Sequence, residues 1–124
     1  MRDMTDFFAD TYALLEIIGG NPHYQKFLSC RLVTSQYNLI ELYYALLRDY
    51  GENIAKKYYQ VYKHFLIQVT DSAIQVGMEF KLEHKKEKLS YVDCLGYALA
   101  VELGMKFLTG DMKFESKQYV EFVK

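Results

Sequence analysis

Short apolar runs alternate with amphipathic helical patterns along the chain. The first run, residues 6–10 (DFFAD), precedes the helix-like stretch TYALLEII, which ends at a pair of glycines. From Gln36 to Tyr50 apolar residues recur at helical spacing, and Gly51 follows where a glycine commonly ends a helix. This alternation predicts strands that are joined by helices.

The rest of the chain continues the pattern. We predict strands at residues 31–35, 66–70 (LIQVT) and 106–109, and a short fifth strand at 119–123. Helices are predicted at about 52–65, at 71–87 with Asp71 as its cap, at 90–103 before Gly104, and, after Asn21, in a short segment that begins with Pro22. Strands separated by helices favour parallel pairing. We therefore expect one domain over residues 1–124, with three-layer α/β/α architecture around a mostly parallel central sheet.

Composition narrows the class of protein. The 124 residues are 51% hydrophobic and 25% charged, which is typical of a globular domain. Cys30 and Cys94 lack CxxC spacing and are expected to be reduced core thiols. The N-terminus carries Asp3 and Asp6 where a signal peptide would be basic, and no apolar run approaches the ~18 residues of a membrane span. We expect a cytoplasmic protein, and its net charge of −1 leaves the partner open.

Three aspartates follow strands or begin a helix where parallel sheets bind ligands. Asp10 and Asp111 come just after predicted strands, and Asp93 lies near the start of a helix that is apolar almost all round. Each also has a purely structural explanation, because Asp10 is placed to cap a helix, Ser90-x-x-Asp93 has capping-box spacing, and Asp111 follows a glycine turn. Asp71 occupies the same kind of position, and we assign it to capping alone.

Glu41 lies within a predicted helix rather than at a strand end. It lies opposite the apolar stripe of the 36–50 helix, so periodicity alone predicts a solvated side chain. Its helical neighbours at positions 37, 38, 44 and 45 include no basic residue that could pair with it.

Four segments together resemble a known family. A strand ends in Asp and a hydroxyl residue in FFADT, a Glu lies on the helix of SQYNLIELYYALL, Ser and Asp open a buried helix in LSYVDCLGYALA, and FLTGDMKF ends a strand with T-x-D and an aromatic. In this order, and over nearly the whole chain, they resemble the PIN domain, specifically the small ribonucleases of the VapC toxin type. Tyr91, Val92 and Gly96 depart from the small residues usual around the third acid.

The resemblance implies a metal-dependent endoribonuclease that is the toxin of a toxin–antitoxin pair. Its substrate would be RNA, its partner an antitoxin protein, and its assembly a homodimer. By the same resemblance Asp10, Glu41, Asp93 and Asp111 would hold one or two Mg²⁺ or Mn²⁺ ions, and Thr11, Ser90 and Thr109 would orient carboxylates, water or phosphate. Electrostatics also favours a metal at such a cluster, because close carboxylates repel by up to about 4 kcal/mol per pair unless cations lie between them. Oxygen ligands select Mg²⁺ and Mn²⁺ among the common metals.

Three alternatives stay open. The chain could be a free-standing PIN ribonuclease without an antitoxin, or a PIN-like domain that only binds. A phosphorelay receiver also places acids at strand ends, but it would need paired acids after its first strand and a lysine that usually precedes a proline, and Pro22 is the only proline.

Other features are explained without a catalytic role. The histidines, His23, His64 and His84, show no ligand spacing. The basic run at 81–88 (KLEHKKEK) is most simply a solvated helix end, although it could hold substrate phosphates. Seven tyrosines crowd two successive helices, and we expect most to pack inside and some to face a partner chain: Tyr37, Tyr43, Tyr44, Tyr50, Tyr58, Tyr59 and Tyr62.

Overall fold

The computed structural model describes residues 6–124, so Asp3 lies outside the described part of the chain. The α-helices are α1 (Thr11–Ile18), α2 (Gln36–Tyr50), α3 (Glu52–Tyr62), α4 (Asp71–Glu83) and α5 (Tyr91–Glu102). The strands are β1 (Asp6–Ala9), β2 (Arg31–Val33), β3 (Lys106–Thr109) and β4 (Val120–Phe122). Short 3-10 helices complete the described fold: η1 (Pro22–Ser29), η2 (Lys63–Phe65), η3 (Lys85–Glu87) and η4 (Met112–Phe114).

The described strands form one sheet in the order β2-β1-β3-β4, and every pair is parallel. On β1, Phe8 pairs with Val33 of β2 and with Phe107 of β3. All four strands therefore end at the same edge of the sheet. The predicted parallel α/β/α architecture is confirmed.

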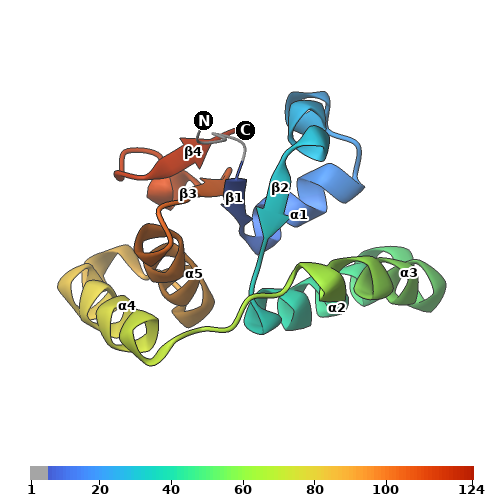
Figure 1. The fold of residues 1–124 in the computed structure, drawn as a ribbon. Coiled ribbons are helices and arrows are strands. Elements are labelled where there is room, and N and C mark those ends of the chain that lie inside the picture. The colour runs from blue at the N-terminus through green and yellow to red at the C-terminus, as the bar shows by residue number, and fades with distance from the viewer. Residues whose placement is uncertain (1–5) are drawn as a thin grey trace.

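Alternate residues of the strands point to opposite faces, and each face carries its own hydrophobic core. Phe7, Leu32 and Leu108 belong to the core that α1, η1, α2 and α3 cover. Phe8 and Phe107 belong to the core that α4 and α5 cover. Figure 1 shows the α2–α3 and α4–α5 pairs on opposite sides of the molecule.

Two glycines let the second core close tightly. A Cβ on Gly77 would lie 2.9 Å from the carbonyl oxygen of Cys94, so glycine allows α4 to cross α5 at close range. A Cβ on Gly96 would lie 2.8 Å from the ring of Phe8. Gly96 thus makes room for the ring of Phe8, and the middle of α5 packs closely on β1.

The predicted strand at 66–70 is wrong. Only Leu66 pairs with the sheet, through an isolated parallel bridge to Thr34. Leu66 packs against the first core, whereas Ile67 and Val69 pack against the second. The segment is apolar because it crosses from one face of the sheet to the other and buries side chains in both cores. Figure 1 shows it as the long connection into α4.

Two smaller expectations also need correction. Thr70, not Asp71, caps α4, because its Oγ1 accepts a hydrogen bond from the amide of Ala73 at 3.0 Å. Most of the seven tyrosines were expected to pack inside, but four of them are exposed: Tyr37, Tyr44, Tyr50 and Tyr59.

Across residues 6–124, no helix combines the length and the apolar character that crossing a bilayer requires. Cys94 is buried and Cys30 is partly buried, and neither forms a disulfide.

Candidate active site

The acids singled out in the sequence lie at the edge where the parallel strands end. Asp10 directly follows β1, and Asp111 follows β3 by two residues. Asp93 lies in the first turn of α5, which packs on one face of the sheet, and Glu41 lies on α2, which packs on the other face. Thus α2 and α5, on opposite faces of the sheet, each place an acid at its carboxyl edge. Ligands commonly bind at this edge in parallel α/β folds.

Asp10 is the most buried of these acids, with 2% of its surface exposed. It caps α1, and its Oδ1 accepts a hydrogen bond from the amide of Ala13 at 2.8 Å. Burial raises its pKa to about 7, hydrogen bonds from Thr109 and Ala13 oppose that rise, and the charges of Asp93 and Asp111 add to it. A cap exposed to water would need none of these neighbours, so capping alone does not explain this environment.

Asp93 carries a similar but weaker perturbation. Burial raises its pKa to about 6, and the charges of Asp111 and Glu41 push it in the same direction. A hydrogen bond with Ser90 and the charge of Lys113 act against this rise. Ser90 also caps α5, since its Oγ accepts the amide of Asp93 at 3.0 Å. The expected helix-start contact between Ser90 and Asp93 is therefore present, and it leaves the carboxylate facing other acids.

Glu41 is held in place by a chain of polar side chains that periodicity could not reveal. The hydroxyl of Thr11 donates to its Oε1 at 2.6 Å, and the amide of Asn38 donates to Thr11 Oγ1 at 3.1 Å. Ser35 in turn donates to Asn38 Oδ1 at 2.7 Å. Glu41 is half-buried rather than solvated, and the buried Asn38 is a site residue that the sequence reasoning missed. The only sequence signal for Asn38 was the position of its side-chain amide one helical turn before Glu41.

Thr109 joins two of the acids. Its buried hydroxyl hydrogen-bonds to the carboxylate of Asp10 and accepts the amide of Asp111 at 3.0 Å. Gly110 between them has no room for a side chain, because a Cβ would lie 2.2 Å from the ring of Tyr12 and 2.5 Å from the carbonyl oxygen of Val123. Tyr12 therefore packs directly on the turn that carries Asp111.

These carboxylates fit a hard divalent cation. Within residues 6–124, no lysine, arginine or histidine forms a salt bridge with Asp10, Glu41, Asp93 or Asp111. All four donors are oxygens, the ligand type that Mg²⁺ and Mn²⁺ prefer. The described side chains are not already arranged as a closed set of metal ligands. The donor chemistry suits a metal, and the side chains would adjust around it.

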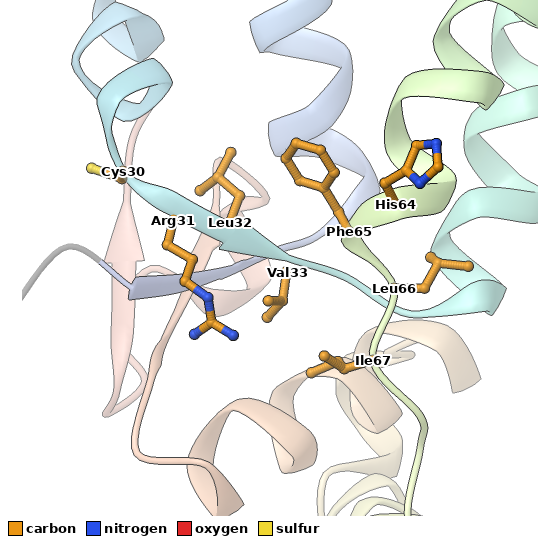
Figure 2. Close-up of a pocket in the computed structure, with 8 residues that line it drawn as sticks. All are labelled: Cys30, Arg31, Leu32, Val33, His64, Phe65, Leu66 and Ile67. Carbon is orange, nitrogen blue, oxygen red and sulfur yellow. The ribbon is translucent and has the colours of Figure 1, made fainter.

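A separate pocket of about 400 Å³ lies along the outer edge of β2, between that strand and residues 64–67. Figure 2 shows its lining, which includes Arg31, Leu32 and His64. None of the seven predicted site residues lines it. Asp71 also lies away from the acids, exposed in the first turn of α4.

In a comparison with protein-family models, residues 7–118 match the PIN domain. The chain belongs to the PIN domain family. A search of curated proteins finds no match. Membership of the PIN family excludes the alternative that the chain is a phosphorelay receiver.

Solved structures of VapC toxins share the PIN fold of this chain. The Mycobacterium tuberculosis toxin VapC20, described as cleaving the sarcin-ricin loop, superposes with a TM-score of 0.79 at 20% identity, covering 95% of this chain and 99% of that one. DNA-bound VapBC from Salmonella typhimurium gives a TM-score of 0.73 at 16% identity, covering 97% and 98%. DNA-bound VapBC2 from Rickettsia felis gives 0.71 at 16% identity, covering 95% and 97%. At these identities the likeness establishes the fold.

Proposed function

We propose that this PIN domain is a metal-dependent endoribonuclease that hydrolyses RNA phosphodiester bonds in the cytoplasm as the toxin of a toxin–antitoxin pair. The observation that carries the proposal is the group of carboxylates without ion-pair partners among the described residues at the carboxyl edge of the sheet, where Asp10 is buried and the charges of Asp93 and Asp111 act on it. Keeping such charges together without cations is costly, which a structural role does not explain.

Each residue has a distinct proposed role. Asp10, Glu41, Asp93 and Asp111 would hold one or two Mg²⁺ or Mn²⁺ ions, which supply a polarised water and neutralise charge that develops on the phosphate. Thr11 orients Glu41 through the 2.6 Å hydrogen bond. Thr109 orients Asp10 and the Asp111 backbone, and Ser90 orients Asp93. Ionised carboxylates are needed to bind the metal, so the raised pKa values of Asp10 and Asp93 favour a metal-free, partly protonated resting site at low pH.

The direct test is cleavage of RNA by the purified protein with Mn²⁺, with Mg²⁺ and with EDTA. We expect internal cleavage with either metal and none with EDTA, and sequencing the new 5′ ends would identify the site. Metal-independent cleavage would contradict the proposed chemistry.

The antitoxin is proposed from the structural neighbours, which include a toxin–antitoxin complex from Klebsiella pneumoniae and the DNA-bound VapBC complexes. The test is to look beside this gene for a reading frame that encodes a small DNA-binding protein and to co-express its product with this chain. A toxin should arrest growth when expressed alone and form a stable complex that relieves the arrest. A free-standing PIN ribonuclease would show neither effect.

We also propose a homodimer through α2 and α3, whose surfaces carry the exposed Tyr37, Tyr44, Tyr50 and Tyr59. A two-fold axis would let the same face pair with itself. Light scattering at tens of micromolar should give twice the mass of the chain, and a monomer mass would refute the pairing.

A further inference from the structure

One flank of the acidic site carries lysines around an exposed aromatic ring. Tyr91 is 66% exposed and opens α5 directly after Ser90. The ammonium of Lys81 lies 4.6 Å from the centroid of its ring. Exposed rings with a cation beside them are a recurring feature of surfaces that bind nucleic-acid bases and phosphates.

Two lysines also donate hydrogen bonds to the turn that leads into α5. Lys88 adopts a left-handed conformation with φ of 56°, and Lys113 of η4 donates to its carbonyl oxygen at 3.1 Å. Lys81 of α4 donates to the carbonyl oxygen of Leu89. The ammonium groups of Lys81 and Lys113 are thus held at defined places beside Ser90 rather than at the ends of free side chains. We call Lys81, Lys88, Lys113 and the ring of Tyr91 the lysine rim.

The lysine rim adjoins the acids themselves. Lys113 follows Asp111 by two residues, and its backbone amide donates to Asp111 Oδ1 at 3.0 Å. Its charge also opposes the rise in the pKa of Asp93 that burial causes. A cation is therefore present immediately outside the proposed metal site.

Within the described residues, the part of α2 beside the acids carries no cation, whereas the ammonium of Lys124 lies 3.3 Å from the carbonyl oxygen of Gly110, next to Asp111. The exposed residues of α2 near the acids are Gln36, Tyr37 and Ile40. The first basic residue of α2 is Arg48, which is paired with Asp49 at 2.8 Å. A polyanion that approaches the acids is therefore attracted on the α4–α5 flank and by Lys124, and it receives no compensation from α2 itself.

We propose that the lysine rim docks single-stranded RNA beside the scissile phosphate, with the ring of Tyr91 stacking on an unpaired base and Lys88 and Lys113 contacting backbone phosphates. The inference rests on the proposed nuclease function and assigns the residues that hold the RNA beside the cut. A stacked base must be unpaired, since a paired base in a duplex offers no free face to a side chain. Tyr91 is thus a specificity-determining residue that requires an unpaired base next to the cleavage site.

The test is binding without catalysis, by fluorescence anisotropy of a labelled short single-stranded RNA in EDTA at two salt concentrations. Tyr91→Ala should weaken binding about tenfold, as loss of one stacked base does, while Tyr91→Phe should bind like wild type. Lys113→Ala should lower the slope of log affinity against log salt by about 0.7, and Lys113→Arg should restore it. The same RNA annealed to its complement should bind more weakly and should not respond to Tyr91→Ala.

Matched controls lie elsewhere on the chain. Tyr119 is 57% exposed and lies directly before β4, and its carbonyl oxygen accepts the amide of Phe107 near the start of β3, so Tyr119→Ala removes an exposed ring outside the lysine rim. Lys106→Ala removes an exposed lysine at the opposite end of β3. Both variants, with their masses measured alongside, should bind RNA like wild type.

Equal losses in Tyr119→Ala and Tyr91→Ala would overturn the proposal. So would equal affinity for the duplex, or displacement of the RNA by polyglutamate at equal charge, since that would identify a site for acidic peptides. Binding that fails while cleavage with Mn²⁺ persists would refute the rim alone. Binding that behaves as expected while cleavage is absent would refute the nuclease function and keep the rim.

Discussion

Asp10 and Asp71 occupy the same local position in two regions of the molecule, since each follows an apolar extended segment and lies at the start of a helix. At the end of β1, Asp10 is buried and the charges of Asp93 and Asp111 raise its pKa. At the start of α4, Asp71 is exposed, and the cap is Thr70. The acid packed near that cap, Glu102, receives hydrogen bonds from the hydroxyls of Thr70 and Ser72.

The difference shows what distinguishes a helix-start acid from a site acid. At the start of α4 the exposed hydroxyls of Thr70 and Ser72 donate to the carboxylate of Glu102, and water can solvate the rest of that carboxylate. At β1 the carboxylate is desolvated and its neighbours carry the same charge, so the arrangement is unfavourable by itself. Unfavourable electrostatics that the fold nevertheless maintains are typical of functional sites.

The largest expected effect separates these two regions by activity. Asp10→Asn and Asp93→Asn should each reduce RNA cleavage by more than about 100-fold, the upper range for residues that merely orient a metal ligand, because each removes a proposed ligand. Asp71→Asn should stay within a few fold of wild type. The measurement is the initial rate of cleavage with Mn²⁺, together with circular dichroism spectra that should be native for all three variants. Comparable losses in all three would mean that capping has been mistaken for chemistry.

A second effect separates the two regions by pH. A carboxyl whose pKa is higher in the folded chain than in the unfolded chain binds its proton more tightly when folded, so its contribution to stability is present at low pH and is lost as pH rises. For Asp10 this window runs from about 4 to about 7. Metal-free wild type should lose up to roughly 4 kcal/mol relative to Asp10→Asn across it, at about 1.36 kcal/mol per pKa unit.

The check is denaturant unfolding of both metal-free proteins at several pH values. Asp71→Asn serves as the control and should parallel wild type throughout. Parallel curves for wild type and Asp10→Asn would contradict the net rise in the pKa of the buried Asp10 carboxyl at the end of β1.

The smallest effect concerns the polar chain that holds Glu41. Asn38→Ala removes the amide that donates to Thr11 at 3.1 Å, and should lower the rate of cleavage about tenfold, as loss of an orienting group does. Because it leaves every proposed ligand in place, raising the Mn²⁺ concentration should recover part of the loss. A variant as inactive as Asp10→Asn at saturating metal would show that Asn38 acts on the fold as a whole.

Local features of the fold could be predicted from the sequence. The bounds of α2 agree with its apolar spacing and with Gly51, and the strand that ends at Thr109 agrees with its apolar run. Residues 66–70 were misread because a segment that serves two cores alternates in the same way as a strand. The cap of α4 was misplaced by one residue, since Thr70 and Asp71 are both good caps.

The site could be predicted only in part, since its decisive contacts are not local. The motifs singled out Asp10 and Asp93, but no spacing rule indicates that the charge of Asp93 raises the pKa of Asp10. Asn38 was missed because its partner, Thr11, lies 27 residues away in the chain. The exposure of Tyr44 was missed because helical spacing does not say which tyrosines a neighbouring helix covers.

The measurement that tests the central claim most directly is a set of four melting curves, wild type and Asp10→Asn, each with EDTA and with Mn²⁺. If the acids form a metal site, Mn²⁺ at 100 times its dissociation constant should stabilise wild type by about 2.7 kcal/mol, a shift of several degrees, and should stabilise Asp10→Asn much less. With EDTA the variant should be at least as stable as wild type, since asparagine caps α1 nearly as well and carries no charge. Equal metal shifts in the two proteins, or a large loss of stability in the metal-free variant, would mean that Asp10 is a structural cap and that no acidic metal site exists at the end of β1.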